Sequence, residues 1–156
     1  SLKKVYREIN KVKIINNISL INNFYKDKIK IKPKIALLGL NPHCETKTKI
    51  SEENAIIKPA IKILKNKKIN VKGPFSADTF FSKQNLIDYD VAIGMYHDQV
   101  LGPMKTIFNF DAINLTLGLP FLRVSPDHGT NHAMIGKNKS NPQSLISSIN
   151  FFKKIK

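Results

Sequence analysis

Two short motifs in this sequence place a histidine close to a carboxylate, a combination that suits metal binding or acid–base chemistry. In GLNPHCE, His43 could ligate a metal ion, and Glu45 could orient it or act as a base. In MYHDQ, His97 is a candidate ligand and Asp98 is a ligand or an orienting group. Because His97 and Asp98 are adjacent, we expect their side chains to point in different directions. The first motif is also compatible with a turn that carries an incidental histidine, and a lone His-Asp pair such as that in MYHDQ is common and unspecific.

A third group of polar residues lies in a mostly apolar stretch. Lys105 follows a Gly-Pro pair that predicts a turn, while Asn114 and Arg123 lie in strand-like runs. A buried Asn or Arg must be paired, so we expect these side chains to serve a ligand or a fixed network. Together the three residues could hold a phosphate or a carboxylate. The alternative is an internal salt bridge of Arg123 with Asp111 or Asp127.

Two further motifs carry carboxylates. In SPDHGT, Asp127 and His128 precede Gly129 and Thr130 in a predicted loop, which could serve a nucleotide pocket or catalysis, or could be an Asx-type turn. In GPFSADTFF, Asp78 lies among apolar neighbours, where it is either a helix cap or a carboxylate that supports a metal ligand.

The elements that must position these residues are predicted from apolar runs between Gly and Pro residues. The predicted strands are Ile35–Leu38, Ile69–Val71, Val91–Met95, Ile113–Leu117 and Leu122–Val124. The first is expected to be buried and parallel. The polar groups come where predicted strands stop, and in open α/β sheets ligands bind beyond the carboxyl ends of strands.

Helices are predicted between these strands, so the sequence favours the α/β class. One helix is expected to contain Val5, Ile9 and Val12, and a second short helix is expected near 18–25, ending before Pro33. Ser51 is the predicted N-cap of another helix, which Pro59 must kink or begin. A last helix follows Pro142, with an expected inner face of Leu145, Ile146, Ile149 and Phe152.

The charge and composition of the chain indicate which kinds of partner it could bind. The 156 residues suit one compact domain, and the formal net charge of +15 is large for this length. A basic nucleic-acid-binding module is one interpretation. However, the lysines are spread along the chain, and only Arg7 and Arg123 are arginines, the residue type that bidentate base recognition favours. We therefore expect neither a nucleic acid nor a membrane as partner.

The remaining composition signals concern compartment and cofactor. Cys44 is the only cysteine, so no intrachain disulfide can form, which fits a cytoplasmic location. The sequence contains neither a G-x-G-x-x-G motif nor a Walker A loop, so any dinucleotide binds without the usual fingerprint.

The ordered set GLNPHCE, GPFSADTFF, MYHDQ, KTIFNFDAINLTLGLPFLR and SPDHGT closely resembles the 4-hydroxythreonine-4-phosphate dehydrogenase family of pyridoxal phosphate biosynthesis. The resemblance covers nearly the whole chain from Leu2. It implies a two-domain fold similar to isocitrate and isopropylmalate dehydrogenases, with a mostly parallel sheet flanked by helices. It also implies oxidation of a phosphorylated hydroxy amino acid with NAD or NADP, followed by decarboxylation, in a homodimer with a shared active site.

The resemblance also implies roles for individual residues. His43 and His97 resemble two of three ligands to a divalent metal, which could be zinc, magnesium, manganese or cobalt. The implied substrate-binding residues are Lys105, Asn114 and Arg123. The implied catalytic residues are Lys105, Asp78 and Asp98, the two carboxylates lying near the metal. The segment Asp127, His128, Gly129 and Thr130 resembles a segment near the nucleotide.

The sequence departs from the family pattern in two ways. The family is longer, so we expect residues 1–156 to be its C-terminal portion, lacking an N-terminal part that supplies a His-Thr pair and the third metal histidine. We expect such a portion to be inactive alone. In addition, Gly136 is kept, but Asn138 stands where a second glycine is common, and His132 is unusual and is interpreted as incidental.

Two other functions remain open at this point. A related dehydrogenase would act on phosphorylated four-carbon sugar acids, such as phosphothreonate or phosphoerythronate. A non-catalytic remnant would fold without chemistry.

Overall fold

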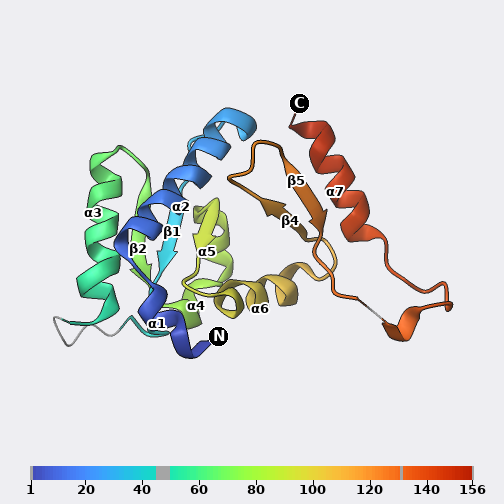
Figure 1. Cartoon of the computed structure of the whole chain (residues 1–156), viewed down its shortest axis with the longest axis horizontal. Helices are drawn as coiled ribbons and strands as arrows, with labels where there is room; N and C mark the ends of the chain where they lie inside the picture. Colours follow the sequence, from blue (N-terminus) through green and yellow to red (C-terminus); the bar gives the residue numbers. More distant parts are fainter. Residues whose placement is uncertain (1, 45–49, 131, 156) are drawn as a thin grey trace. The chain divides into compact units, whose positions relative to one another are not determined.

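The computed structural model describes residues 2–44, 50–130 and 132–155 (Figure 1). The chain divides into two compact units, Ser1–Pro103 and Met104–Lys156. Helix α6 (His97–Phe108) crosses the boundary between them. Within the described part of the chain, no helix is long and apolar enough to cross a membrane.

The first unit is built on a parallel sheet of β1 (Ile35–Leu38), β2 (Val71–Phe75) and β3 (Val91–Ile93), in the order β2-β1-β3. The strand predicted at 35–38 is therefore confirmed, and the one predicted at 91–95 is present but ends at Ile93. The strand predicted at 69–71 instead begins at Val71, although Ile69 is buried beside it. This parallel sheet with flanking helices confirms the predicted α/β class.

The central strand β1 is buried along its whole length because both faces of the sheet are covered. Ile35 and Leu37 pack against one helical layer, while Ala36 and Leu38 face an aromatic cluster that includes Phe80. Successive side chains of a strand point to opposite faces, so this strand must be apolar throughout.

The helical layer consists mainly of α2 (Lys11–Phe24) and α3 (Lys58–Asn66). The single helix predicted through Val5 and Val12 is in fact broken. Its first part consists of η1 (Leu2–Lys4) and α1 (Val5–Glu8). A new helix, α2, then begins after Asn10, whose side chain caps it by accepting a hydrogen bond from the Lys13 amide. The separate helix predicted near 18–25 belongs to α2 and to the π-helical turn η2 (Tyr25–Ile29).

Two predictions about the third helix are confirmed. The hydroxyl of Ser51 accepts a hydrogen bond from the Asn54 amide, as an N-cap does, and the π-helical turn η3 (Glu53–Ile57) follows. Pro59 lies in the first turn of α3, directly after the π-helical turn η3. The other face of the sheet is covered by α4 (Ala77–Phe80), and α5 (Lys83–Asp88) precedes β3.

The second unit contains an antiparallel pair, β4 (Ile113–Thr116) and β5 (Arg123–Pro126), followed by η4 (His132–Met134) and α7 (Gln143–Lys154). The predicted inner face of α7 is wrong: Leu145, Ile146, Ile149 and Phe152 are exposed, whereas Ser144 and Ser148 are buried. Hydrogen bonds of Ser144 to the segments around β4 and β5 set this orientation.

Candidate functional site

Polar residues follow each strand of the parallel sheet. The Gly39–Cys44 loop follows β1, Asp78 lies in α4 after β2, and His97 begins α6 after β3. Because the three strands are parallel, their carboxyl ends meet at the same edge of the sheet. The expected arrangement of the histidine motifs at strand ends is therefore confirmed.

Gly73 in β2 lets the strand ends approach closely. Its backbone φ is +139°, and an added Cβ would collide with the carbonyl oxygen of Leu37 in β1. Only glycine combines this backbone angle with such an approach. The register between β1 and β2 shifts at this point, between the Ala36 and Leu38 pairs.

His43 is paired with Asp78. The Nδ1 atom of His43 lies 2.8 Å from Oδ2 of Asp78. The Asp78 amide also donates to the carbonyl of Pro42 at 3.4 Å, so the His43 loop and α4 are joined by backbone as well as by side chains. Glu45, the other carboxylate suggested in this motif, lies outside the described residues.

A buried carboxylate holds the His43 loop, and sequence reasoning missed it. Glu53 is 1% exposed, and its Oε1 accepts a hydrogen bond from the Asn41 amide at 2.9 Å. The side chain of Asn41 in turn accepts from the His43 amide at 2.9 Å. The position of His43 therefore depends on Glu53, ten residues later. The sequence alone indicates Glu53 only as an acidic residue in the first turn of a helix.

Cys44, the residue after His43, has a thiol whose surroundings favour the protonated form. Burial raises the pKa of this thiol.

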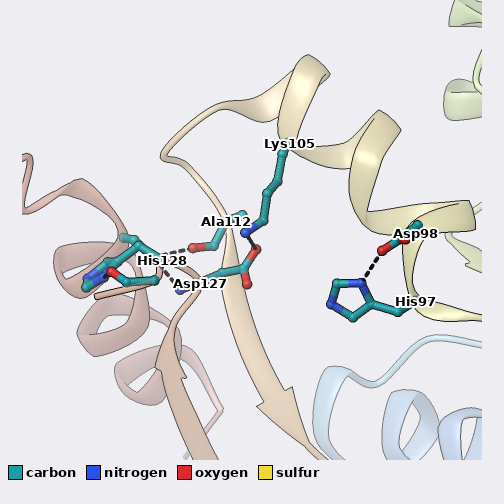
Figure 2. Close-up of polar contacts among 8 residues, drawn as sticks. His97, Asp98, Lys105, Ala112, Asp127 and His128 are labelled. Atoms are coloured by element: carbon teal, nitrogen blue, oxygen red, sulfur yellow. Dashed lines mark hydrogen bonds and ion pairs between the residues drawn. The ribbon is translucent and has the colours of Figure 1, made fainter. Parts of the chain in front are cut away.

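His97 is paired with its neighbour Asp98, contrary to the expectation that the two side chains diverge. The Nδ1 atom of His97 lies 2.7 Å from Oδ1 of Asp98 at the first turn of α6 (Figure 2). Both side chains are exposed. Both residues belong to the first turn of α6, a helix that the sequence did not predict.

The chemistry of this donor set fits a divalent metal. A carboxylate on Nδ1 is the usual support of a metal-binding histidine, because it fixes the tautomer and leaves Nε2 to bind the ion. His43 and His97 both have this support. Among the described residues, however, no three His, Cys, Asp or Glu side chains converge as a metal site would require. A metal ion bound by His43 and His97 would therefore need further ligands from outside the described residues.

In the second unit, Lys105 and Asp127 form an ion pair. Lys105 Nζ lies 3.7 Å from Asp127 Oδ2 (Figure 2). The predicted turn before Lys105 is wrong, because Gly102 and Pro103 lie inside α6. Asp127 is also held through its backbone, since its amide donates to Ser144 Oγ at 2.8 Å and the same hydroxyl donates to the Ala112 carbonyl.

Asn114 and Arg123 are exposed on one face of the β4–β5 pair, so the expectation that they are buried is wrong. Asn114 is opposite Ser125, and Thr116 is opposite Arg123. Paired residues of an antiparallel ladder share a face, as do residues two apart. Arg123 is the first residue of β5 and Asn114 lies within β4, so neither follows the carboxyl end of a strand.

The suggested salt bridge of Arg123 is also wrong. Its guanidinium donates to Thr116 Oγ1 at 3.0 Å, while Asp111 accepts from Ser147 and Asp127 pairs with Lys105. An exposed cation held by a hydroxyl remains able to bind an anion.

The segment after Asp127 is exposed. His128 Nδ1 lies 3.3 Å from the carbonyl of its neighbour Gly129, and Thr130 is exposed as well. Asn138, the departure from the expected second glycine, has a φ of +52°. Asn is the residue type after glycine that best tolerates this left-handed backbone, so the substitution is conformationally mild.

Comparison with known proteins agrees with this arrangement. The family model described as "Pyridoxal phosphate biosynthetic protein PdxA" matches residues 1–152. A protein of Sulfurihydrogenibium sp. (strain YO3AOP1), named 4-hydroxythreonine-4-phosphate dehydrogenase, is 47% identical over 150 residues, covering 95% of this chain and 46% of that protein. A relative of the same name from Bradyrhizobium diazoefficiens is 42% identical, covering 96% of this chain and 44% of its own length.

Solved structures give the same result. The crystal structure of 4-hydroxythreonine-4-phosphate dehydrogenase from Klebsiella pneumoniae matches 99% of this chain and 47% of its own, with a TM-score of 0.83 and 33% identity. The structure of a putative enzyme of that name from Salmonella typhimurium matches 100% of this chain and 48% of its own chain, with a TM-score of 0.81 and 34% identity. The chain thus spans about half the length of the relatives it matches.

Proposed function

Because the chain belongs to the pyridoxal phosphate biosynthetic protein PdxA family, we propose that it is the C-terminal portion of a 4-hydroxythreonine-4-phosphate dehydrogenase. The relatives carry that name, which denotes an oxidoreductase. The proposed reaction is the NAD- or NADP-dependent oxidation and decarboxylation of 4-phosphohydroxy-L-threonine to 3-amino-2-oxopropyl phosphate. We place this reaction in the cytoplasm.

One observation carries the proposal. Two histidines lie at the carboxyl ends of neighbouring parallel strands, and each has its Nδ1 held by a carboxylate. We propose His43 and His97 as ligands of a divalent metal, with Asp78 and Asp98 fixing their tautomers. When bound, the metal would supply a Lewis acid for the substrate hydroxyl. Neutral imidazole ligands leave most of its positive charge available.

Three residues of the second unit suit an anionic substrate. Lys105 and Arg123 are cations, and Arg123 presents the planar fork that matches phosphate or carboxylate oxygens. Asn114 shares the face of Arg123 and adds an amide. Lys105 is already paired with Asp127 at 3.7 Å, a separation that allows exchange for a substrate oxygen.

The remaining parts of the proposal concern the cofactor and assembly. Asp127, His128, Gly129 and Thr130 follow β5, the last three of them exposed, and we propose this segment for nicotinamide dinucleotide contact. We further propose a homodimer with a shared active site. Since the chain spans about half of its relatives' length, residues 1–156 alone are predicted to be inactive.

The test is NADH formation by the full reading frame with 4-phosphohydroxy-L-threonine and NAD, with and without a chelator. We expect the wild type to form NADH, to lose this activity with a chelator and to regain it when divalent metal is added. The His97→Ala variant should form no NADH. His132→Ala is the matched control and should retain activity. A folded, metal-loaded protein without NADH formation would contradict the proposal.

A second candidate substrate class is tested in the same assay. The exposed pair Arg123 and Asn114 would also suit phosphorylated four-carbon sugar acids. Turnover of phosphothreonate or phosphoerythronate without turnover of the amino acid would move the assignment to that class.

A further inference from the structure

Gln99 is a buried polar residue of the MYHDQ motif with no role in the proposed chemistry. It is 7% exposed, whereas its neighbours His97 and Asp98 are exposed. Its Nε2 donates to the carbonyl of Gly39 at 2.7 Å, and its Oε1 accepts from the amide of Met95 at 2.7 Å. Both ends of its amide are thus bonded to backbone.

These two backbone groups lie just beyond the ends of neighbouring strands. The ladder between β1 and β3 ends at the pair Leu37 and Ile93. Gly39 follows β1 directly, and its amide donates to the Phe75 carbonyl at the end of β2 at 2.9 Å. Met95 is two residues beyond β3. A side-chain amide has the same donor and acceptor as a peptide group, so Gln99 extends the sheet's hydrogen bonding past the last backbone pair.

The surroundings of Gln99 are shaped to fit it. A Cβ added at Gly94 would lie 3.2 Å from Gln99 Oε1 and 2.9 Å from the Val100 side chain. Glycine at this position therefore leaves the space that the glutamine amide occupies.

The bridge connects the two segments that carry the candidate metal ligands. Gly39 begins the loop that contains His43, and Met95 precedes His97 by two residues. We propose that Gln99 is a positioning residue that sets the spacing of His43 and His97, and thereby the affinity of the divalent-metal site. This inference rests on the proposed function, since it takes these histidines as ligands.

The proposal can be separated from a purely structural role. A buried amide that only satisfies backbone groups would affect stability but not metal affinity. In Gln99→Glu, one oxygen can still accept from Met95, but the donor to Gly39 is lost. Gln99→Met has a similar length and loses both bonds. Ile18→Val, on the buried face of α2, is the matched control that lowers stability without removing a hydrogen bond of Gln99.

The experiment is a titration of the metal-free protein from the full reading frame with Co²⁺, followed by its visible absorption. Thermal unfolding and exchange of the Met95 amide are measured in parallel. We expect Gln99→Glu and Gln99→Met to bind Co²⁺ about 10- to 100-fold more weakly with an altered spectrum, as found for groups that support metal ligands. Ile18→Val should bind within about twofold of wild type.

Each outcome has a distinct meaning. Wild-type Co²⁺ affinity in both Gln99 variants would overturn the inference and leave the metal site intact. Equal weakening in Ile18→Val would also overturn it, since general destabilisation would then be sufficient. No Co²⁺ binding by the wild type would contradict the metal site of the proposed function itself. If Gln99→Met fails to fold, Gln99→Glu carries the test.

Discussion

The parallel-sheet edge and the β4–β5 pair hold their candidate residues in different ways. At the sheet edge, buried polar groups such as Glu53 and Gln99 fix the backbone that carries His43 and His97. On the β4–β5 pair, Asn114 and Arg123 are exposed, and Arg123 is held by a single hydroxyl.

This difference matches what each region is proposed to bind. A metal ion tolerates little error in ligand position, so its ligands are best fixed before it binds. An extended anionic substrate can be met by side chains that adjust on binding. Changes at the sheet edge should therefore alter metal affinity, whereas changes on β4 and β5 should alter substrate affinity.

The largest expected effect is a loss of metal affinity when the carboxylate beside a candidate histidine is replaced, and it should be larger for Asp78 than for Asp98. Asp78→Asn should weaken Co²⁺ binding about 10- to 100-fold, because the amide no longer supports His43 as a base would. Asp98→Asn should cost less, since the Asp98 side chain is 71% exposed against 37% for Asp78 and water can replace it. Equal losses in the Co²⁺ titration would contradict this ranking.

A smaller effect is expected on the β4–β5 pair. Arg123→Lys should raise the KM for the phosphorylated substrate about tenfold with little change in kcat, because lysine lacks the planar fork. Steady-state kinetics of the full-length protein measure this. Arg7→Lys, at the only other arginine, is the matched control. A fall in kcat at unchanged KM would assign Arg123 to the chemical step instead.

Ser144 is predicted to stabilise the second unit. Ser144→Ala removes the acceptor of the Asp127 amide and the donor to Ala112, so the free energy of unfolding should fall by about 1–2 kcal/mol. Urea denaturation measures the change. Ser147→Ala is the control, because its bond to Asp111 is exposed and should contribute little. Similar losses in both variants would contradict the assigned role of Ser144.

The smallest effect concerns pH and lies away from both regions. Burial, followed by the charge of Asp90, raises the pKa of Tyr25 above its usual range. The folded state therefore keeps the phenol proton at a pH where the unfolded state has lost it. The free energy of unfolding should then fall as pH rises through the usual tyrosine range, toward the raised pKa. Tyr25→Phe should flatten this dependence in urea denaturation, and an unchanged slope would contradict it.

Local patterns in the sequence were sufficient to predict the strands that precede the segments carrying His43 and His97. The apolar run 35–38 and the glycines that follow the strands carry that information without any long-range contact. The divergence expected of His97 and Asp98 was wrong because the start of α6 depends on the fold around MYHDQ rather than on adjacency alone.

Long-range partners could not be predicted in this way. Gln99 and Gly39 are 60 residues apart, and Ser144 and Ala112 are 32 apart, so no local period links them. The face of α7 was reversed for the same reason. Its apolar spacing predicted an inner side, but the hydrogen bonds of Ser144 determine which side meets the strands.

The most direct test of the central claim is a double-mutant cycle of Co²⁺ affinity with His43→Ala, His97→Ala and the double variant. If both histidines bind one ion, each single variant should lose nearly as much affinity as the double. Additive losses, or a single variant that retains wild-type affinity, would contradict a shared metal site at the carboxyl ends of β1 and β3.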